Sequence, residues 1–250
     1  MFLFRPLRFL YGILTAILFA VSMLIVVPCY FFVFSFYSQS KAPHVAHKYI
    51  SRRWAKLIYL LFFLRVKIKG EEFIDEKKTY VFIANHVSQL DVPAYAIACK
   101  NTIRFLAKAE LTKIPLMGYI IRKLYLSVDR SDKEARHRSM MNLRKSLEEG
   151  ISVFICPEGT RNRTSEPLLD FKDGAFRLAI EGQVPLAVLT VMDSQKLLSP
   201  LRPVELAPGT IHAFWDKPID TMGMTEADLP VLMEKARALM LSHLISRLVD

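Results

Sequence analysis

Short apolar runs alternate with amphipathic stretches along the chain after Gly70. The apolar runs predict strands, and the amphipathic stretches predict helices over Asp132–Glu149, Asp173–Glu181 and about Thr225–Leu248. Strands that alternate with helices predict an α/β domain with a largely parallel sheet flanked by helices. The predicted strands are Tyr80–Ala84, Ile103–Ala107, Leu124–Val128, Ile151–Ile155, Leu186–Val191 and Thr210–Trp215.

The N-terminal part has a different pattern, because no charged residue occurs from Phe9 to Ser40. As a helix this run would measure roughly 48 Å, against about 30 Å for the hydrocarbon core of a bilayer. It is too long for a signal peptide, so we expect a membrane-associated segment in which Pro28 kinks the helix or turns it back. Flanking basic residues are more numerous on the C-terminal side, which favours a catalytic domain facing the cytoplasm: Arg5 and Arg8 before, and Lys41, Lys48, Arg52, Arg53 and Lys56 after.

A second apolar patch, Trp54–Leu64, is too short to cross a bilayer. Its basic residues and Trp54 indicate an amphipathic helix at the membrane interface, and a core helix of the soluble domain is the alternative. We therefore predict two parts: membrane-associated helices over residues 1–64 and an α/β domain over residues 65–250.

The composition agrees with contact with lipid. Of the 250 residues 52% are hydrophobic, the mean hydropathy is +0.24, and the net charge is +10. Such a charge favours an anionic partner, and nucleic acid, an acidic membrane and a phosphorylated substrate all fit. The sequence shows no helix-turn-helix, zinc finger or aromatic RNA-binding signature, so we expect no nucleic acid partner. Three scattered cysteines form no disulfide framework or metal pattern, and we expect no metal.

The first stretch with candidate chemistry is "NHVSQLD", which follows the predicted strand Tyr80–Ala84. Ser88 and Asp91 fit an S-x-x-D helix start, and Asp91 alone is an alternative cap. On one helix His86 and Asp91 would point about 140° apart, so they meet only if His86 lies in the turn. In that arrangement the carboxylate holds one ring nitrogen and leaves the other free as a base. The alternative is a polar turn with a capped helix.

The second stretch is "PEGTR", directly after the predicted strand Ile151–Ile155. Ligands of open α/β sheets bind at the carboxyl ends of strands. Gly159 permits close approach of the backbone, and the planar fork of Arg161 suits a phosphate. A turn with a surface ion pair is the alternative for this stretch.

Together these two stretches resemble the signature motifs of the glycerolipid acyltransferases, the family that includes 1-acyl-sn-glycerol-3-phosphate (lysophosphatidic acid) acyltransferases. Their separation of about 70 residues is similar to that of the family. The resemblance covers roughly Gly70 to Ile219. Further matching stretches are "AKAELTKIPLMGYIIRKLYLSVDR" (Ala107–Arg130), "FKDGAF" (Phe171–Phe176), "VPLAVLTV" (Val184–Val191), "PGTI" and "KPI".

The resemblance implies transfer of a fatty acyl group from acyl carrier protein or coenzyme A to the hydroxyl of lysophosphatidic acid, in phospholipid synthesis. It implies a His86 base oriented by Asp91, with no covalent intermediate and no cofactor besides the thioester co-substrate. Glu158, Gly159, Thr160 and Arg161 are the implied acceptor-binding residues. Lys108 and Arg130 are further candidates for contact with a phosphate or an oxyanion.

The family resemblance implies membrane lipids as partners, with a bacterial inner membrane as the expected location. Other acceptors stay open, namely glycerol-3-phosphate, dihydroxyacetone phosphate, a lyso-aminolipid or another lysophospholipid. A membrane-anchored lipid-binding protein without catalysis is the alternative from another class. Two features depart from the family: Cys156 stands where an aromatic residue is usual, and the proline-rich excursion Leu197–Pro208 matches no motif.

Overall fold

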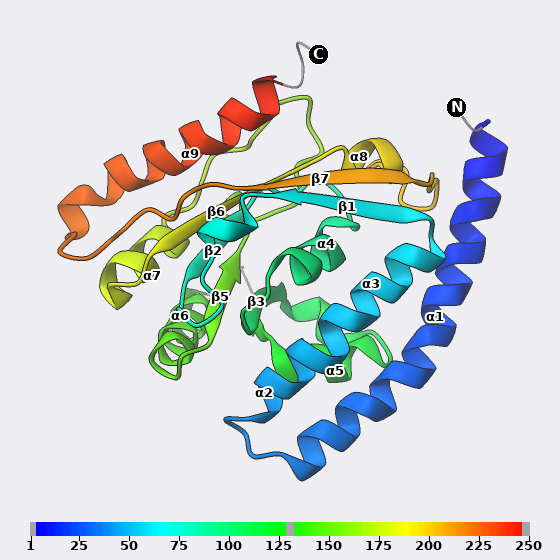
Figure 1. Cartoon of the computed structure of the whole chain (residues 1–250), viewed down its shortest axis with the longest axis horizontal. Helices are drawn as coiled ribbons and strands as arrows, with labels where there is room; N and C mark the ends of the chain where they lie inside the picture. The colour runs from blue at the N-terminus through cyan, green and yellow to red at the C-terminus, as the bar shows by residue number, and fades with distance from the viewer. Residues whose placement is uncertain (1–3, 129–132, 247–250) are drawn as a thin grey trace.

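A seven-stranded sheet forms the centre of the protein in the computed structural model, which describes residues 4–128 and 133–246 (Figure 1). The strand order is β1-β7-β6-β2-β5-β3-β4. The five strands from β6 to β4 are parallel, whereas β7 runs antiparallel to β6 and pairs in parallel with β1. The predicted α/β class is confirmed. The strands are β1 (Leu64–Lys69), β2 (Val81–Ala84), β3 (Ile103–Lys108), β4 (Leu126–Val128), β5 (Ser152–Ile155), β6 (Leu186–Met192) and β7 (Gly209–Trp215).

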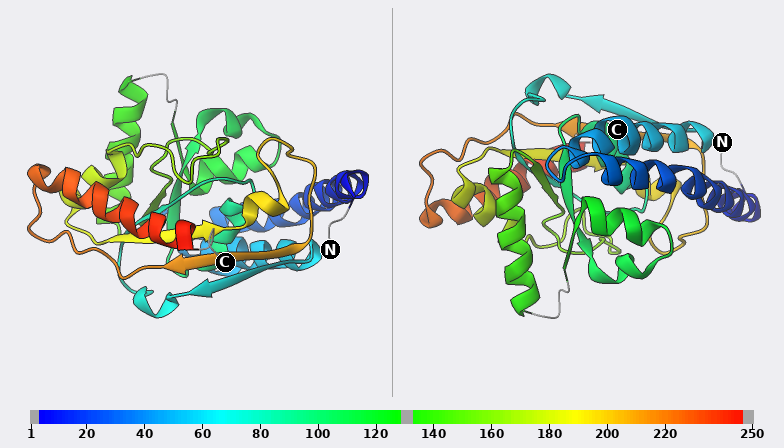
Figure 2. Two further views of the ribbon diagram at one scale, coloured as in Figure 1. Left: turned by 90° about the horizontal axis from the view of Figure 1, so that it is seen from above. Right: turned by 90° about the horizontal axis from the view of Figure 1, so that it is seen from below.

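Helices cover both faces of the sheet, which is why the central strands are apolar throughout. Side chains of β2 alternate between the faces: Phe82 packs toward α3 and α4, and Ile83 packs toward α6, α7 and α9. Figure 2 shows α9 in front when the molecule is seen from above and α1 in front when it is seen from below. The helices are α1 (Arg5–Phe36), α2 (Ala42–Val45), α3 (Arg52–Leu61), α4 (Asp91–Ala98), α5 (Met117–Leu124), α6 (Lys133–Glu148), α7 (Gly174–Gly182), α8 (Ser194–Leu197) and α9 (Leu229–Ser246), with a π-helical turn η1 (Ala46–Ser51) and 3-10 turns η2 (Glu71–Phe73), η3 (Ala109–Lys113) and η4 (Glu226–Asp228).

The structure differs from the predicted elements in three places. Strand β1 was not predicted, because half of its sequence "LRVKIK" is basic and the strand lies at the edge of the sheet, paired with β7. The strand predicted from Leu124 begins at Leu126, since Leu124 is the last residue of α5. At the C-terminus the single helix predicted from Thr225 starts with the 3-10 turn η4 before α9 begins at Leu229, and Leu248 lies outside the described residues.

The N-terminal helix α1 is continuous through Pro28 and lies along the rest of the protein beside α3 and α5 (Figure 1). The chain reverses after Phe36 rather than at Pro28. A narrow stripe of α1 is buried, and most of the remaining surface of the helix is exposed and apolar. The buried stripe consists of Gly12, Thr15, Met23, Val26, Tyr30 and Val33.

Helix α3 contributes to the core, as one of the two alternatives for its sequence requires, and also has an exposed apolar side. Ala55, Ile58 and Tyr59 are buried in the core that contains α4 and one face of the sheet. Leu57 and Leu60 on the opposite side of the helix are exposed. The helix therefore covers the core with one side and leaves a second apolar surface beside α1.

Candidate active site

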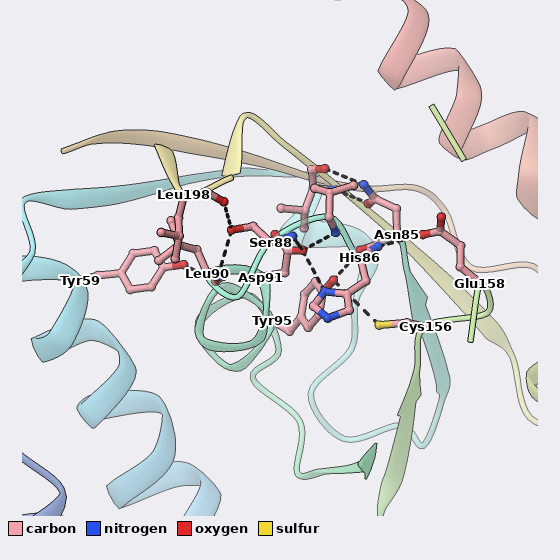
Figure 3. Close-up of polar contacts among 12 residues, drawn as sticks. Tyr59, Asn85, His86, Ser88, Leu90, Asp91, Tyr95, Cys156, Glu158 and Leu198 are labelled. Atoms are coloured by element: carbon pink, nitrogen blue, oxygen red, sulfur yellow. Dashed lines mark hydrogen bonds and ion pairs between the residues drawn. The ribbon is translucent and has the colours of Figure 1, made fainter. Parts of the chain in front are cut away.

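His86 lies in the loop between β2 and α4, and Asp91 lies at the start of α4, at the carboxyl end of a central strand (Figure 3). Nδ1 of His86 is 2.9 Å from Oδ2 of Asp91. His86 is in the turn and Asp91 is the first residue of α4, which is the arrangement their spacing requires for contact. The loop thus brings a base and a carboxylate together within five residues.

One oxygen of Asp91 receives several hydrogen bonds. Besides the contact with His86, Oδ2 accepts the backbone N–H groups of Val87 and Ser88, both at 2.7 Å. The side chain of Asp91 is fully buried, and Oδ1 has no partner within the described part of the chain. Because an ionised carboxylate only accepts, Nδ1 of His86 carries the proton and Nε2 of the neutral ring has a free lone pair.

The helix start differs from a full capping box. Asp91 accepts the N–H of Ser88, which is one half of that motif. The hydroxyl of Ser88 instead donates to the carbonyl of Leu198 at 2.7 Å, and among the described residues no side chain caps the start of α4. The backbone N–H of Ser88 therefore holds Asp91, and its hydroxyl makes a long-range contact with Leu198.

The second motif holds the backbone of His86 from both sides. Oε1 of Glu158 accepts the N–H of His86 at 2.9 Å, and the N–H of Asn162 donates to the carbonyl of His86 at 2.7 Å. Oε2 of Glu158 accepts the N–H of Leu169 at 2.9 Å. Burial raises the pKa of the Glu158 carboxyl, and these N–H donors oppose that shift. The two motifs meet because β2 and β5 are adjacent and parallel, so their following loops share one edge of the sheet.

Three further residues support the loop and had not been singled out from the sequence. The amide of Asn85 donates to the carbonyl of Val191 and accepts its N–H, both at 2.8 Å, which extends the β2–β6 pairing by one side chain. The hydroxyl of Tyr95 donates to the carbonyl of Asn85, and that of Tyr59 donates to the carbonyl of Leu90 at 2.5 Å. Asn85 was visible within the motif "NHVSQLD", whereas the tyrosines are typical core residues in sequence and no signal distinguishes them.

Arg161 has the properties of an anion ligand. Its guanidinium is half-buried, and within the described residues no hydrogen-bond partner is found for its buried Nε. Burial lowers the pKa of Arg161, and the charge of Asp91 opposes that shift. Gly159 takes a left-handed conformation (φ 71°) in the turn that precedes Arg161, a backbone geometry that favours glycine, and Thr160 is exposed.

The last two candidates, Lys108 and Arg130, are not among the described contacts of His86 and Asp91. Lys108 is at the end of β3, exposed, with its Nζ 2.9 Å from Oε1 of Glu110. Arg130 lies outside the described residues. Among residues 4–128 and 133–246 no group of three or more His, Cys, Asp or Glu side chains is placed to hold a metal ion. That no cofactor is required stays a prediction.

Comparisons with known proteins connect this geometry to a family. A sequence model of the family described as Acyltransferase matches residues 65–192, which contain both motifs. A 1-acyl-sn-glycerol-3-phosphate acyltransferase of Saccharomyces cerevisiae is 32% identical over 208 residues, covering 80% of this chain and 67% of that protein. The beta form of this enzyme from Homo sapiens is 31% identical over 176 residues, covering 68% of this chain and 62% of that protein.

A solved structure shares the whole fold. The crystal structure of the 1-acyl-sn-glycerophosphate (LPA) acyltransferase from Thermotoga maritima matches with a TM-score of 0.77, covering 98% of this chain and 97% of that one at 23% identity. At that identity the likeness concerns the fold. The chain spans about two thirds of the length of the yeast and human relatives.

Proposed function

Because the chain belongs to the acyltransferase family, we propose that it acylates the free hydroxyl of lysophosphatidic acid, using a fatty acyl thioester, in phospholipid synthesis. The observation that carries this proposal is the buried carboxylate of Asp91 on Nδ1 of His86, with the half-buried Arg161 close enough for its charge to interact with Asp91. The names of the yeast and human relatives support lysophosphatidic acid as the acceptor. The donor is either acyl carrier protein or coenzyme A carrying the acyl chain.

In the proposed reaction Nε2 of His86 takes the proton of the acceptor hydroxyl as its oxygen attacks the thioester carbonyl. Asp91 holds the Nδ1–H and stabilises the imidazolium that forms. The tetrahedral intermediate then expels the thiolate, which receives the proton from His86. The acceptor oxygen attacks directly, so no acyl-enzyme forms, and a positioned base of this kind contributes about 10²- to 10⁴-fold in rate.

Two residues of the second motif receive different roles. Arg161 binds the acceptor phosphate, since its planar fork matches phosphate oxygens and its guanidinium is half-buried. The sequence predicts Glu158 at the acceptor as well. Because both of its oxygens accept backbone N–H groups, we propose instead that Glu158 positions His86. Gly159 and Thr160 stay candidates for contact with the acceptor.

The exposed apolar surface of α1 and α3 gives a reason for membrane association. By length and composition, helix α1 is long and apolar enough to cross a membrane. Of its most apolar 18-residue stretch, 22% is buried against the rest of the protein. We propose that α1 and the outer side of α3 contact the bilayer, so that the acceptor reaches the site from the membrane. A cytoplasmic orientation in a bacterial inner membrane belongs to this proposal.

The test of the membrane surface uses charges placed on α1. The double variant Leu14→Glu, Ile17→Glu alters two exposed positions and should lose flotation with anionic vesicles while retaining its fold. The control is Val231→Glu, an apolar position on α9 that is more exposed than either altered residue. Unchanged flotation of the double variant would overturn this surface.

The decisive experiment for the activity is an assay of the purified protein with radiolabelled lysophosphatidic acid and each of the two thioester donors. We expect labelled phosphatidic acid from the wild type and nearly none from His86→Ala. Turnover with another acceptor alone would replace lysophosphatidic acid, and binding of lipid without turnover by the wild type would indicate a lipid-binding protein instead.

A further inference from the structure

The connection between β6 and β7 lies between the N-terminal helix and the His86 loop. It comprises α8 and the proline-rich excursion, which matches no motif in the sequence. The two arms of the excursion are joined by a bridge between Leu198 and Leu206 and by the N–H of Ala207, which donates to the carbonyl of Leu197 at 2.9 Å. These backbone contacts hold the two ends of the excursion together.

One end of this excursion holds the catalytic loop. The carbonyl of Leu198 accepts the hydroxyl of Ser88 at 2.7 Å, and Ser88 is fully buried (Figure 3). The N–H of the same serine donates to Oδ2 of Asp91. A displacement of Leu198 therefore moves Ser88, and with it one of the two backbone N–H groups that hold the carboxylate of Asp91 against His86.

The same excursion is held from the other side by Arg8 of α1. Nη2 of Arg8 is within hydrogen-bond distance of three backbone carbonyls, those of Lys196 (3.0 Å), Leu197 (2.9 Å) and Glu205 (3.3 Å). Together these carbonyls come from both arms of the excursion. Arg8 is partly buried, so lost contacts are not simply replaced by bulk water.

The backbone of α1 also touches the excursion directly. A Cβ atom on Gly12 would lie 1.5 Å from the carbonyl oxygen of Val204, so at this position only glycine allows the approach. Gly12 is one helical turn after Arg8 and lies on the same side of α1. The register of α1 against the excursion is therefore set by two adjacent contacts.

We propose that Arg8 is a positioning residue for the His86–Asp91 pair, acting through the excursion and Ser88. This inference rests on the proposed acyl transfer for its kinetic consequence. Helix α1, which carries the exposed apolar surface, then also supports the active site. A movement of α1 would displace Leu198 and Ser88, and through them Asp91.

The kinetic test compares Arg8→Ala with Arg5→Ala in the full-length protein. Arg5 lies on the same helix with the same charge, but it is exposed and forms an ion pair with Glu205 at the longer distance of 3.6 Å. In detergent micelles we expect Arg8→Ala to lower kcat about tenfold or more with little change in the acceptor KM, because small displacements of reacting groups are costly. Arg5→Ala should stay within about twofold of the wild type.

Three further variants distinguish loss of positioning from general loss of structure. Arg8→Lys retains the charge and one donor group, and it should recover part of kcat. Ser88→Ala breaks the contact with Leu198, so the double variant Arg8→Ala, Ser88→Ala should lose no more than the worse single variant. Fully additive losses, or equal losses for Arg8→Ala and Arg5→Ala, would overturn the proposal.

A measurement independent of activity keeps this inference distinct from the proposed function. Amide hydrogen exchange should show faster exchange at Val87 and Ser88 in Arg8→Ala, since their N–H groups donate to Asp91. Unchanged exchange there would contradict the proposal even in an active enzyme. Faster exchange in a protein without acyltransferase activity would retain the structural link and reject the reaction.

Discussion

Two of the three histidine–aspartate pairs among the described residues have the same local geometry and different surroundings. Nδ1 of His86 is 2.9 Å from Oδ2 of Asp91, and Nδ1 of His212 is 2.9 Å from Oδ2 of Asp193. The first pair lies within one loop, whereas the second joins β7 to the residue after β6. Distance alone does not separate a candidate catalytic pair from a structural one.

The other contacts of each carboxylate make the difference. Asp91 is fully buried and accepts two backbone N–H groups, so its charge is fixed and directed at the imidazole. Oδ1 of Asp193 is 2.9 Å from the ammonium of Lys196, an exposed side chain. A carboxylate already paired with a lysine stabilises an imidazolium less. The backbone of His86 is in addition held by Glu158 and Asn162.

Replacing the histidine of each pair is expected to give the largest difference in activity between the two pairs. His86→Ala should lower kcat by about 10²- to 10⁴-fold because the base is lost. His212→Ala removes a ring with the same contact and should change kcat by less than about twofold. Steady-state assays of both variants, with circular dichroism to verify folding, provide the measurement. Comparable losses in two folded variants would remove the distinction between the pairs.

The next effect concerns the carboxylates. Asp91→Asn retains the shape but removes the charge that supports the imidazolium, and we expect kcat to fall about 100-fold. Asp193→Asn breaks the ion pair with exposed Lys196, and its activity should stay close to that of the wild type. Single-turnover rates measure the chemical step for both. An Asp91→Asn enzyme with wild-type rates would show that the charge is dispensable.

A smaller effect is expected at the arginines of the second motif. Arg161→Lys retains a positive charge but loses the planar fork, so the acceptor KM should rise about tenfold with the donor KM nearly unchanged. Arg163→Lys, two residues further on and exposed, is the matched control. Initial rates with acceptor and donor varied separately give both constants. If the acceptor KM does not change, Arg161 does not bind the phosphate.

The smallest expected effect concerns stability. Glu158→Gln places an amide NH₂ against one of two backbone N–H groups that the carboxylate now accepts, at a cost of about 1–3 kcal/mol. Glu181→Gln, an exposed residue 3.7 Å from Arg144, should change the free energy of unfolding by less than about 0.5 kcal/mol. Urea unfolding of both variants measures the difference. Equal free energies of unfolding for the two variants would show that Glu158 does not stabilise the backbone around His86.

Much of the sheet was predictable because buried central strands are continuous apolar runs. Each of the six predicted strands has a counterpart in the structure, and the two motifs follow β2 and β5 as expected. Strand β1 escaped prediction because an edge strand retains charged side chains, and its pairing with β7 gives it the strand conformation. The path of α1 was also open, since an uncharged run determines the length of a helix but not the surface on which it lies.

The sequence by itself determined the residues of the motifs, their separation and the strands that precede them, because these depend on local pattern. It also contained all six histidines without showing which would meet an aspartate in a buried setting. Only the tertiary structure placed Glu158 on the backbone of His86 and Arg8 on the excursion beside Ser88. These contacts join segments far apart in the chain, and their partners are backbone groups, which every residue carries and no sequence pattern distinguishes.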